Sequence, residues 1–291
     1  MTKEEFSRLA ARGPVLLDGA TGSNLRAAGM PVGVSPELWV LEHPEVLLDL
    51  QRSYVEAGSQ IVMAPTFSAN RLSLQNFGLE ERVVELNAKL VVLSKEAAGG
   101  RALVAGDLST MGRPLEPVGD MPYGLAYDTY REQMEALAEA GADLLAVETL
   151  MGADEALAAL DAAVGLELPV LVSFSAEADG GVPFGGTVWD AAAMAQEMGA
   201  SAVGVNCSVG PDQLESVIRS IRASVEIPVI AKPNAGLPAM DEHGQARYSM
   251  GPEDFARHVC VLAEAGANLL GGCCGSTPAY IRRLNESLHG R

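Results

Sequence analysis

The chain has 291 residues, 48% of them hydrophobic, which is enough for one large α/β barrel or for two ordinary domains. Its 20 Lys and Arg against 38 Asp and Glu give a formal net charge of −18, which argues against nucleic acid as a ligand because phosphate binding needs a positive surface. No signal-peptide core and no membrane span of about 20 apolar residues is present, and four cysteines are too few for a disulfide framework, so a cytoplasmic protein is expected.

Eight short apolar segments are typical of buried parallel strands, because each is continuous rather than alternating. One phrase, a helix end, a glycine and an apolar run, recurs at 56–67, 139–150, 197–208 and 264–275. Four further strands are predicted at 14–19, 102–108, 169–175 and 228–234. The glycine in each phrase is the usual signal that a helix has ended.

Helical stretches separate these strands. Examples lie at 44–58, 80–99, 126–141, 153–165 and 252–266. Regular alternation without a low-complexity linker predicts a single (β/α)8 TIM-type barrel that occupies residues 1–291 as one domain, with a longer loop at 111–124 after the third strand. A doubly wound sheet is the alternative architecture.

Three of the four cysteines fall at the carboxyl ends of predicted strands, where TIM barrels carry their active sites. Cys207 ends the sixth strand, and Cys273 and Cys274 end the eighth. These two strands flank the seventh in a barrel, so the three thiols can converge. Adjacent cysteines serve one site only if the backbone bends there, and the flanking glycines permit such a bend.

Three thiolates in a reducing compartment suit Zn²⁺, and a site with three protein ligands leaves a position for water or substrate. The other interpretation is that these cysteines are small buried hydrophobic residues, which is how Cys260 in a helical stretch is interpreted. Histidine ligands have little support, because none of the four lies at a strand end. They are His43, His243, His258 and His289.

Six short segments together resemble the homocysteine S-methyltransferase family. They are DGATGS (18–23), PTFSAN (65–70), VETL (147–150), GVNCS (204–208), KPNAG (232–236) and GGCCG (271–275). The resemblance extends from about residue 14 to residue 286. Within the family the chain is most similar to the homocysteine-binding barrel of cobalamin-dependent methionine synthase.

The resemblance implies a zinc ion held by Cys207, Cys273 and Cys274, with the thiol of homocysteine as the fourth ligand. Zinc would deprotonate that thiol and present the thiolate to a methyl donor. Asn234 would occupy the fourth position when substrate is absent.

The resemblance also implies a site for the amino-acid end of homocysteine. Asp18 and Glu148 would bind the ammonium group, and the backbone around Gly19 and Ala20 would bind the carboxylate. Thr66 would be a further substrate contact.

One departure from the family pattern concerns the second strand, where methionine synthases commonly have E-T-N-T-F. This chain has Pro65 in place of the asparagine, which removes a backbone donor and puts the local pocket in doubt.

The expected function is zinc-dependent methylation of homocysteine to methionine. The donor would be a methylated corrinoid on a separate protein, or methylcobalamin, and the chain would be a free-standing core or subunit of a methionine synthase. Two alternatives remain open: a small onium donor such as S-methylmethionine or betaine, and a zinc- or thiol-binding module without turnover.

Overall fold

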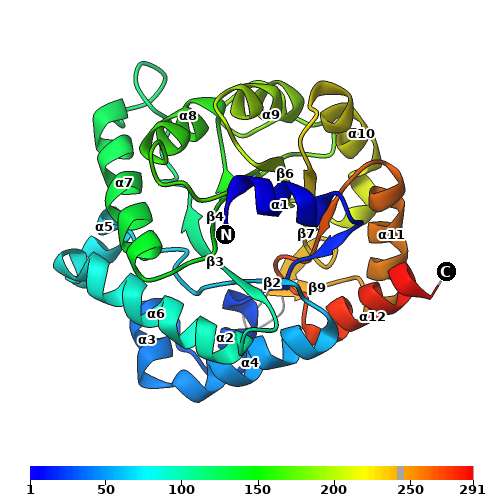
Figure 1. Ribbon diagram of the computed structural model, residues 1–291, viewed down its shortest axis with the longest axis horizontal. Helices are drawn as coiled ribbons and strands as arrows, with labels where there is room; N and C mark the ends of the chain where they lie inside the picture. Colours follow the sequence, from blue (N-terminus) through cyan, green and yellow to red (C-terminus); the bar gives the residue numbers. More distant parts are fainter. Residues whose placement is uncertain (241–245, 291) are drawn as a thin grey trace.

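Eight parallel strands form the centre of the molecule in the computed structural model, which describes residues 1–240 and 246–290. They pair in the order β1-β10-β7-β6-β5-β4-β3-β2 (Figure 1). Their bounds are β1 Val15–Leu16, β2 Ile61–Met63, β3 Leu103–Ser109, β4 Leu144–Leu150, β5 Val170–Phe174, β6 Ala202–Cys207, β7 Val229–Pro233 and β10 Leu269–Leu270.

The two end strands of this sheet close on each other. Leu17, directly after β1, forms a parallel bridge with Ile61 of β2. The amide of Gln60 donates to the carbonyl of Leu16 over 2.7 Å. The sheet is therefore a barrel rather than a doubly wound layer, and the predicted (β/α)8 fold is confirmed.

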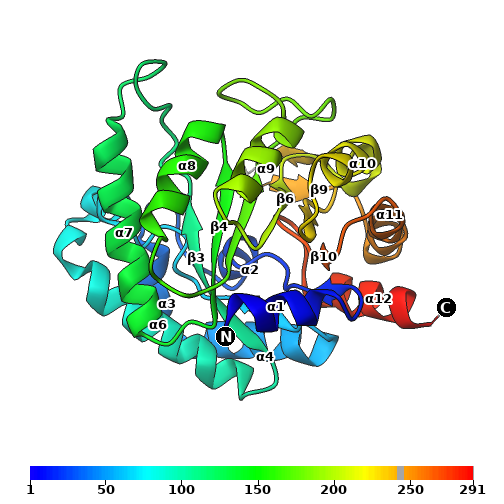
Figure 2. The same ribbon diagram turned by 45° about the horizontal axis from the view of Figure 1, so that its top comes forward.

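One long helix follows each barrel strand and covers the outside of the sheet (Figures 1 and 2). These helices are α4 Pro44–Ala57, α6 Val83–Ala98, α7 Tyr123–Glu139, α8 Ala153–Ala162, α9 Val188–Glu197, α10 Glu215–Ser224, α11 Pro252–Glu264 and α12 Pro278–His289. The glycines of the recurring phrase, Gly58, Gly141, Gly199 and Gly266, all have positive φ, as expected of residues that end a helix.

Shorter elements decorate this frame. They are α1 Lys3–Ala10, α2 Gly22–Ala27, α3 Pro36–Glu42, α5 Arg71–Leu74, and the 3₁₀ turns η1 Gln75–Phe77, η2 Glu80–Arg82 and η3 Pro211–Gln213. An antiparallel hairpin, β8 Pro238–Met240 and β9 Ala246–Tyr248, follows β7 and was not expected from the sequence.

Apolar side chains fill both the barrel interior and the space between strands and helices. The interior cluster takes residues two apart along a strand, such as Ile61 and Met63, because successive side chains point to opposite faces. Phe6 and Ala10 of α1 join this cluster, so α1 covers the end of the barrel at which the strands begin (Figure 1). The opposite end is left for a functional site.

The second strand ends earlier than predicted. We expected it to reach Thr66, but β2 ends at Met63. Pro65 has no N–H to continue the ladder, and the amide of Thr66 turns back to the carbonyl of Ala64 over 2.7 Å.

Among the described residues, no helix is long and apolar enough to cross a membrane.

Candidate metal centre and substrate pocket

The three cysteines at the carboxyl ends of β6 and β10 lie together. The Sγ atoms of Cys207, Cys273 and Cys274 are all within 4.8 Å of one another, and those of Cys207 and Cys274 are 3.7 Å apart. All three side chains are partly exposed, whereas Cys260 is buried in α11. The convergence predicted from the strand positions is therefore present.

A tight turn after β10 allows two adjacent cysteines to serve one site. The Ser276 amide and hydroxyl both donate to the carbonyl of Cys273, over 3.1 and 2.7 Å. Gly275 has a φ of +83°, and a Cβ there would lie 2.3 Å from the ring of Tyr248. Only glycine accommodates both that φ and that contact. The backbone is also bent at the third cysteine, because Cys207 has a φ of +58°.

The cysteine cluster is arranged to hold one negative charge, on Cys274. The pKa of Cys274 is lowered to about 3, because the thiols of Cys207 and Cys273 donate hydrogen bonds to its sulfur. The hydrogen bonds that the Cys273 thiol forms with Cys207 and with Cys274 raise the pKa of Cys273 well above its ordinary value. Anionic sulfur is the form in which cysteine binds metals.

The described histidines lie away from this cluster. His43 joins α3 to α4, His258 lies within α11, and His289 ends α12. His243 lies outside the described residues. Sulfur is therefore the donor type that the site offers within the described part of the chain.

A cavity of about 390 Å³ opens beside the cysteines and contains six of the predicted site residues: Gly19, Ala20, Glu148, Cys207, Cys273 and Cys274. Its wall also includes Asp107, Lys232, Pro65 and Phe67, with residues from the start of α2. Asp18, Thr66 and Asn234 lie outside the set of described residues that line it.

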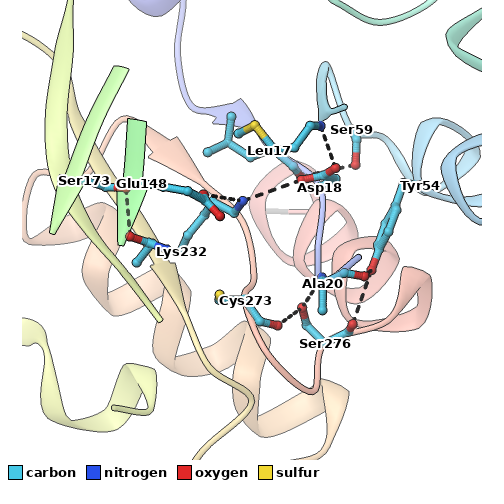
Figure 3. A network of polar contacts seen from close by, with 12 residues as sticks. Leu17, Asp18, Ala20, Tyr54, Ser59, Glu148, Ser173, Lys232, Cys273 and Ser276 are labelled. Atoms are coloured by element: carbon cyan, nitrogen blue, oxygen red, sulfur yellow. Dashed lines mark hydrogen bonds and ion pairs between the residues drawn. The ribbon is translucent and has the colours of Figure 1, made fainter. Parts of the chain in front are cut away.

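A buried lysine, which we did not predict as a site residue, lies between the two carboxylates expected to bind the ammonium group (Figure 3). Lys232 Nζ donates to Glu148 Oε2 over 3.0 Å and lies 3.8 Å from Asp18 Oδ1. Lys232 is 3% exposed, Glu148 8% and Asp18 0%. Burial alone would lower the pKa of Lys232, but the charges of Glu148 and Asp18 outweigh it and raise that pKa.

Asp18 is fixed at the end of β1. Its Oδ2 accepts a hydrogen bond from the amide of Met63 over 2.8 Å. Burial raises the pKa of Asp18 to about 6, against the opposing charge of Lys232. This carboxylate holds β1 against β2 and already has an internal ammonium beside it.

Thr66 is hydrogen bonded to Asp107 in the wall of the pocket. Its hydroxyl accepts from the amide of Asp107 over 3.0 Å and donates to the carbonyl of the same residue over 2.8 Å. Thr66 is 0% exposed. This arrangement favours a positioning role over the direct substrate contact we predicted.

The side-chain amide of Asn234 has a hydrogen-bond partner for its nitrogen but, in the described part of the chain, none for its oxygen. Its Nδ2 donates to the carbonyl of Ser208 over 2.9 Å, and its buried Oδ1 has no partner among the described residues. Its neighbours Pro233 and Ala235 are hydrogen bonded to the backbone of Cys273 and Cys274, so an unpartnered amide oxygen here is compatible with the predicted reserve ligand.

Asn206, next to Cys207, supports the ends of the two strands β4 and β5 through its side chain. Its Oδ1 accepts from the amide of Thr149 (2.7 Å) and the hydroxyl of Ser173 (2.9 Å), and its Nδ2 donates to Thr149 Oγ1 (2.7 Å). Thr149 has a φ of +64°, which is unfavourable for a β-branched residue. These hydrogen bonds hold the strained residue that follows Glu148.

The amide of Ala20 is already used, because it donates to Ser276 Oγ over 3.1 Å. Gly19 packs tightly, since a Cβ there would lie 2.6 Å from Tyr54 Oη. The cavity wall continues from Gly19 through Gly22 and Ser23, where α2 begins and its first N–H groups lack helical partners.

The fold and site define the class of protein: a TIM barrel whose strand ends carry a three-cysteine centre beside a polar pocket. A sequence model of homocysteine S-methyltransferases matches residues 15–288. The chain therefore belongs to the homocysteine S-methyltransferase family.

Individual relatives agree with this assignment. Methionine synthases of Mycobacterium tuberculosis and Mycobacterium leprae are each 30% identical over 92% of this chain, which spans 24% of their length. The oxidized form of the homocysteine methyltransferase MmuM from Escherichia coli has 26% identity and a TM-score of 0.81, with 96% of this chain and 97% of MmuM covered. Its metallated form has 25% identity and a TM-score of 0.80, with 95% and 97% covered.

Proposed function

We propose that this protein binds zinc through Cys207, Cys273 and Cys274 and transfers a methyl group to the sulfur of homocysteine, which yields methionine. The observation that carries the proposal is the sulfur cluster opening into a cavity lined by buried charged side chains. Family membership supports the same acceptor.

The cysteine geometry fits a tetrahedral metal. Ligand sulfurs around zinc, with Zn–S bonds of about 2.3 Å, lie about 3.8 Å apart. The Cys207 and Cys274 sulfurs are 3.7 Å apart, which matches this spacing. The existence of a metallated form of MmuM also supports a metal here. Zinc, when bound, supplies the Lewis acidity that keeps a coordinating thiol deprotonated at neutral pH.

The remaining pocket residues bind and orient the amino acid. Glu148 at the end of β4 offers a carboxylate to the amino group, with Asp18 behind it. The backbone that runs from Gly19 to Ser23, where α2 begins, faces the carboxylate of the substrate. The proton of the substrate thiol is released to solvent.

The transfer step is a displacement at the methyl carbon. A new sulfur–carbon bond forms from the electron pair of the thiolate, and the bond between that carbon and the donor breaks. Its electron pair stays with the donor, as a reduced corrinoid or as a neutral thioether or amine. The small cavity holds the thiolate near the incoming methyl group and restricts water.

For the donor, we propose a methylated corrinoid carried by a separate protein, which the similarity to methionine synthases supports. A small onium donor is the second candidate. It is favoured by the match to MmuM, whose chain this one covers almost completely.

The test is methionine formation by the zinc-loaded protein from homocysteine and, separately, methylcobalamin, S-methylmethionine or betaine. The expected result is turnover with one donor class, loss of turnover in Cys273→Ala and retention in the matched variant Cys260→Ala. Zinc binding without turnover from any donor or a methylated corrinoid protein would replace the proposal with a zinc-binding module.

A further inference from the structure

The pocket contains more buried carboxylates than cations. Asp18 follows β1, and Asp107 and Glu148 lie near the ends of the neighbouring strands β3 and β4; the three residues are 0%, 6% and 8% exposed, in that order. Lys232 is the one Lys or Arg among the described residues that line the cavity. It donates to Glu148 and lies beside Asp18, and it forms no salt bridge with Asp107 in the described part of the chain.

Asp107 is rigidly held, but one oxygen of its carboxyl group has no hydrogen-bond partner among the described residues, and burial raises its pKa well above the ordinary value. Its amide and carbonyl are both hydrogen bonded to the Thr66 hydroxyl, which fixes this point of β3. The adjoining Leu108 and Ser109 pair with Val147 and Glu148 of β4. The side chain lines the cavity, yet its buried Oδ1 has no hydrogen-bond partner among the described residues. Buried polar atoms are normally hydrogen bonded, so this oxygen marks a place for a ligand donor.

We propose that Asp107 binds the amino group of the substrate and selects amino-acid thiols over simple thiols. This inference deepens the proposed function, on which it rests. Glu148, with Asp18 behind it, also faces the amino group, but these two carboxylates share Lys232 as a counter-ion, whereas Asp107 adds a carboxyl oxygen without such a partner in the described structure. A substrate ammonium beside Asp107 supplies the second cation that the cluster lacks, with Lys232 as a fixed internal counter-ion.

The experiment compares two thiols that differ only in the amino group, homocysteine and 4-mercaptobutanoate, by calorimetric titration of the zinc-loaded protein. In Asp107→Asn the affinity for homocysteine falls about 10- to 100-fold, the loss of a charge-assisted hydrogen bond, while the affinity for 4-mercaptobutanoate changes less than about threefold. The matched control Asp128→Asn, on the exposed face of α7, leaves both affinities unchanged. Asp107→Ser gives the same selectivity as Asp107→Asn, and thermal melts verify that each variant is folded.

Each outcome decides the inference. Equal losses for the two thiols, or an unchanged affinity for homocysteine, overturn it. A wild-type protein that binds both thiols but transfers no methyl group overturns the proposed function alone, and the selectivity of the variants still decides the role of Asp107. A zinc-loaded wild-type protein that binds neither thiol overturns both.

Discussion

The replacement Lys232→Met tests whether the buried charges of the pocket stabilise one another. It removes the ammonium that lies 3.0 Å from Glu148 Oε2 and 3.8 Å from Asp18 Oδ1 and leaves two buried carboxylates unpaired. Removing one partner of a buried ion pair costs about 3–5 kcal/mol. With an unfolding entropy of about 2.1 cal/mol/K per residue, this loss lowers the Tm of a chain of 291 residues by about 5–8 °C.

The assay is denaturant unfolding at pH 7.5 and at pH 5, supported by thermal melts. The deficit shrinks at pH 5, because Asp18, whose pKa is raised to about 6, is then largely protonated and no longer needs a counter-ion. The double variant Lys232→Met/Glu148→Gln recovers at least half of the loss. The matched control is Lys89→Met, which breaks an ion pair with Glu85 whose side chains are 57% and 42% exposed and costs less than about 1 kcal/mol. A Lys232→Met variant as stable as Lys89→Met would refute the reasoning.

Three further changes probe the metal ligands, the strand-end network and the buried acid. Cys273→Ala purifies with less than about a tenth of a zinc per chain, whereas Cys260→Ala retains about one, as measured by metal analysis; equal contents would contradict the ligand assignment. Asn206→Ala loses three buried hydrogen bonds and the support of Thr149, so unfolding in urea reveals a loss of about 2–4 kcal/mol. The raised pKa of Asp18, about 6 against 3.8, means that stability falls as pH rises from 3.8 to 6, and Asp18→Asn flattens this dependence in a pH series of melts; an unchanged slope would contradict it.

The barrel and the cysteine cluster could be predicted from the sequence, because both follow from local patterns. Continuous apolar runs that follow positive-φ glycines such as Gly141 and Gly266 indicate parallel strands. The order of strands in a barrel then places Cys207 near Cys273. The closing contact between Leu17 and Ile61 is long-range, and the near-regular repetition of eight units favours it without specifying it.

The pairing of side chains in the pocket could not be predicted in the same way. Lys232 and Asp107 were visible at strand ends, but which carboxylate the lysine neutralises depends on distances across the barrel. Thr66 was predicted to contact substrate, yet its hydroxyl is hydrogen bonded to a neighbouring strand end, which strand position alone does not reveal. The hairpin β8–β9, whose Tyr248 packs on Gly275, lies in a connection without apolar periodicity.

X-ray absorption at the zinc edge tests the central claim most directly, because it counts the sulfur atoms bound to the metal before and after homocysteine is added. The account predicts three sulfur ligands in the zinc-loaded protein, from Cys207, Cys273 and Cys274, and four with saturating homocysteine. A count that stays at three with homocysteine bound, or that is below three without it, would contradict the account.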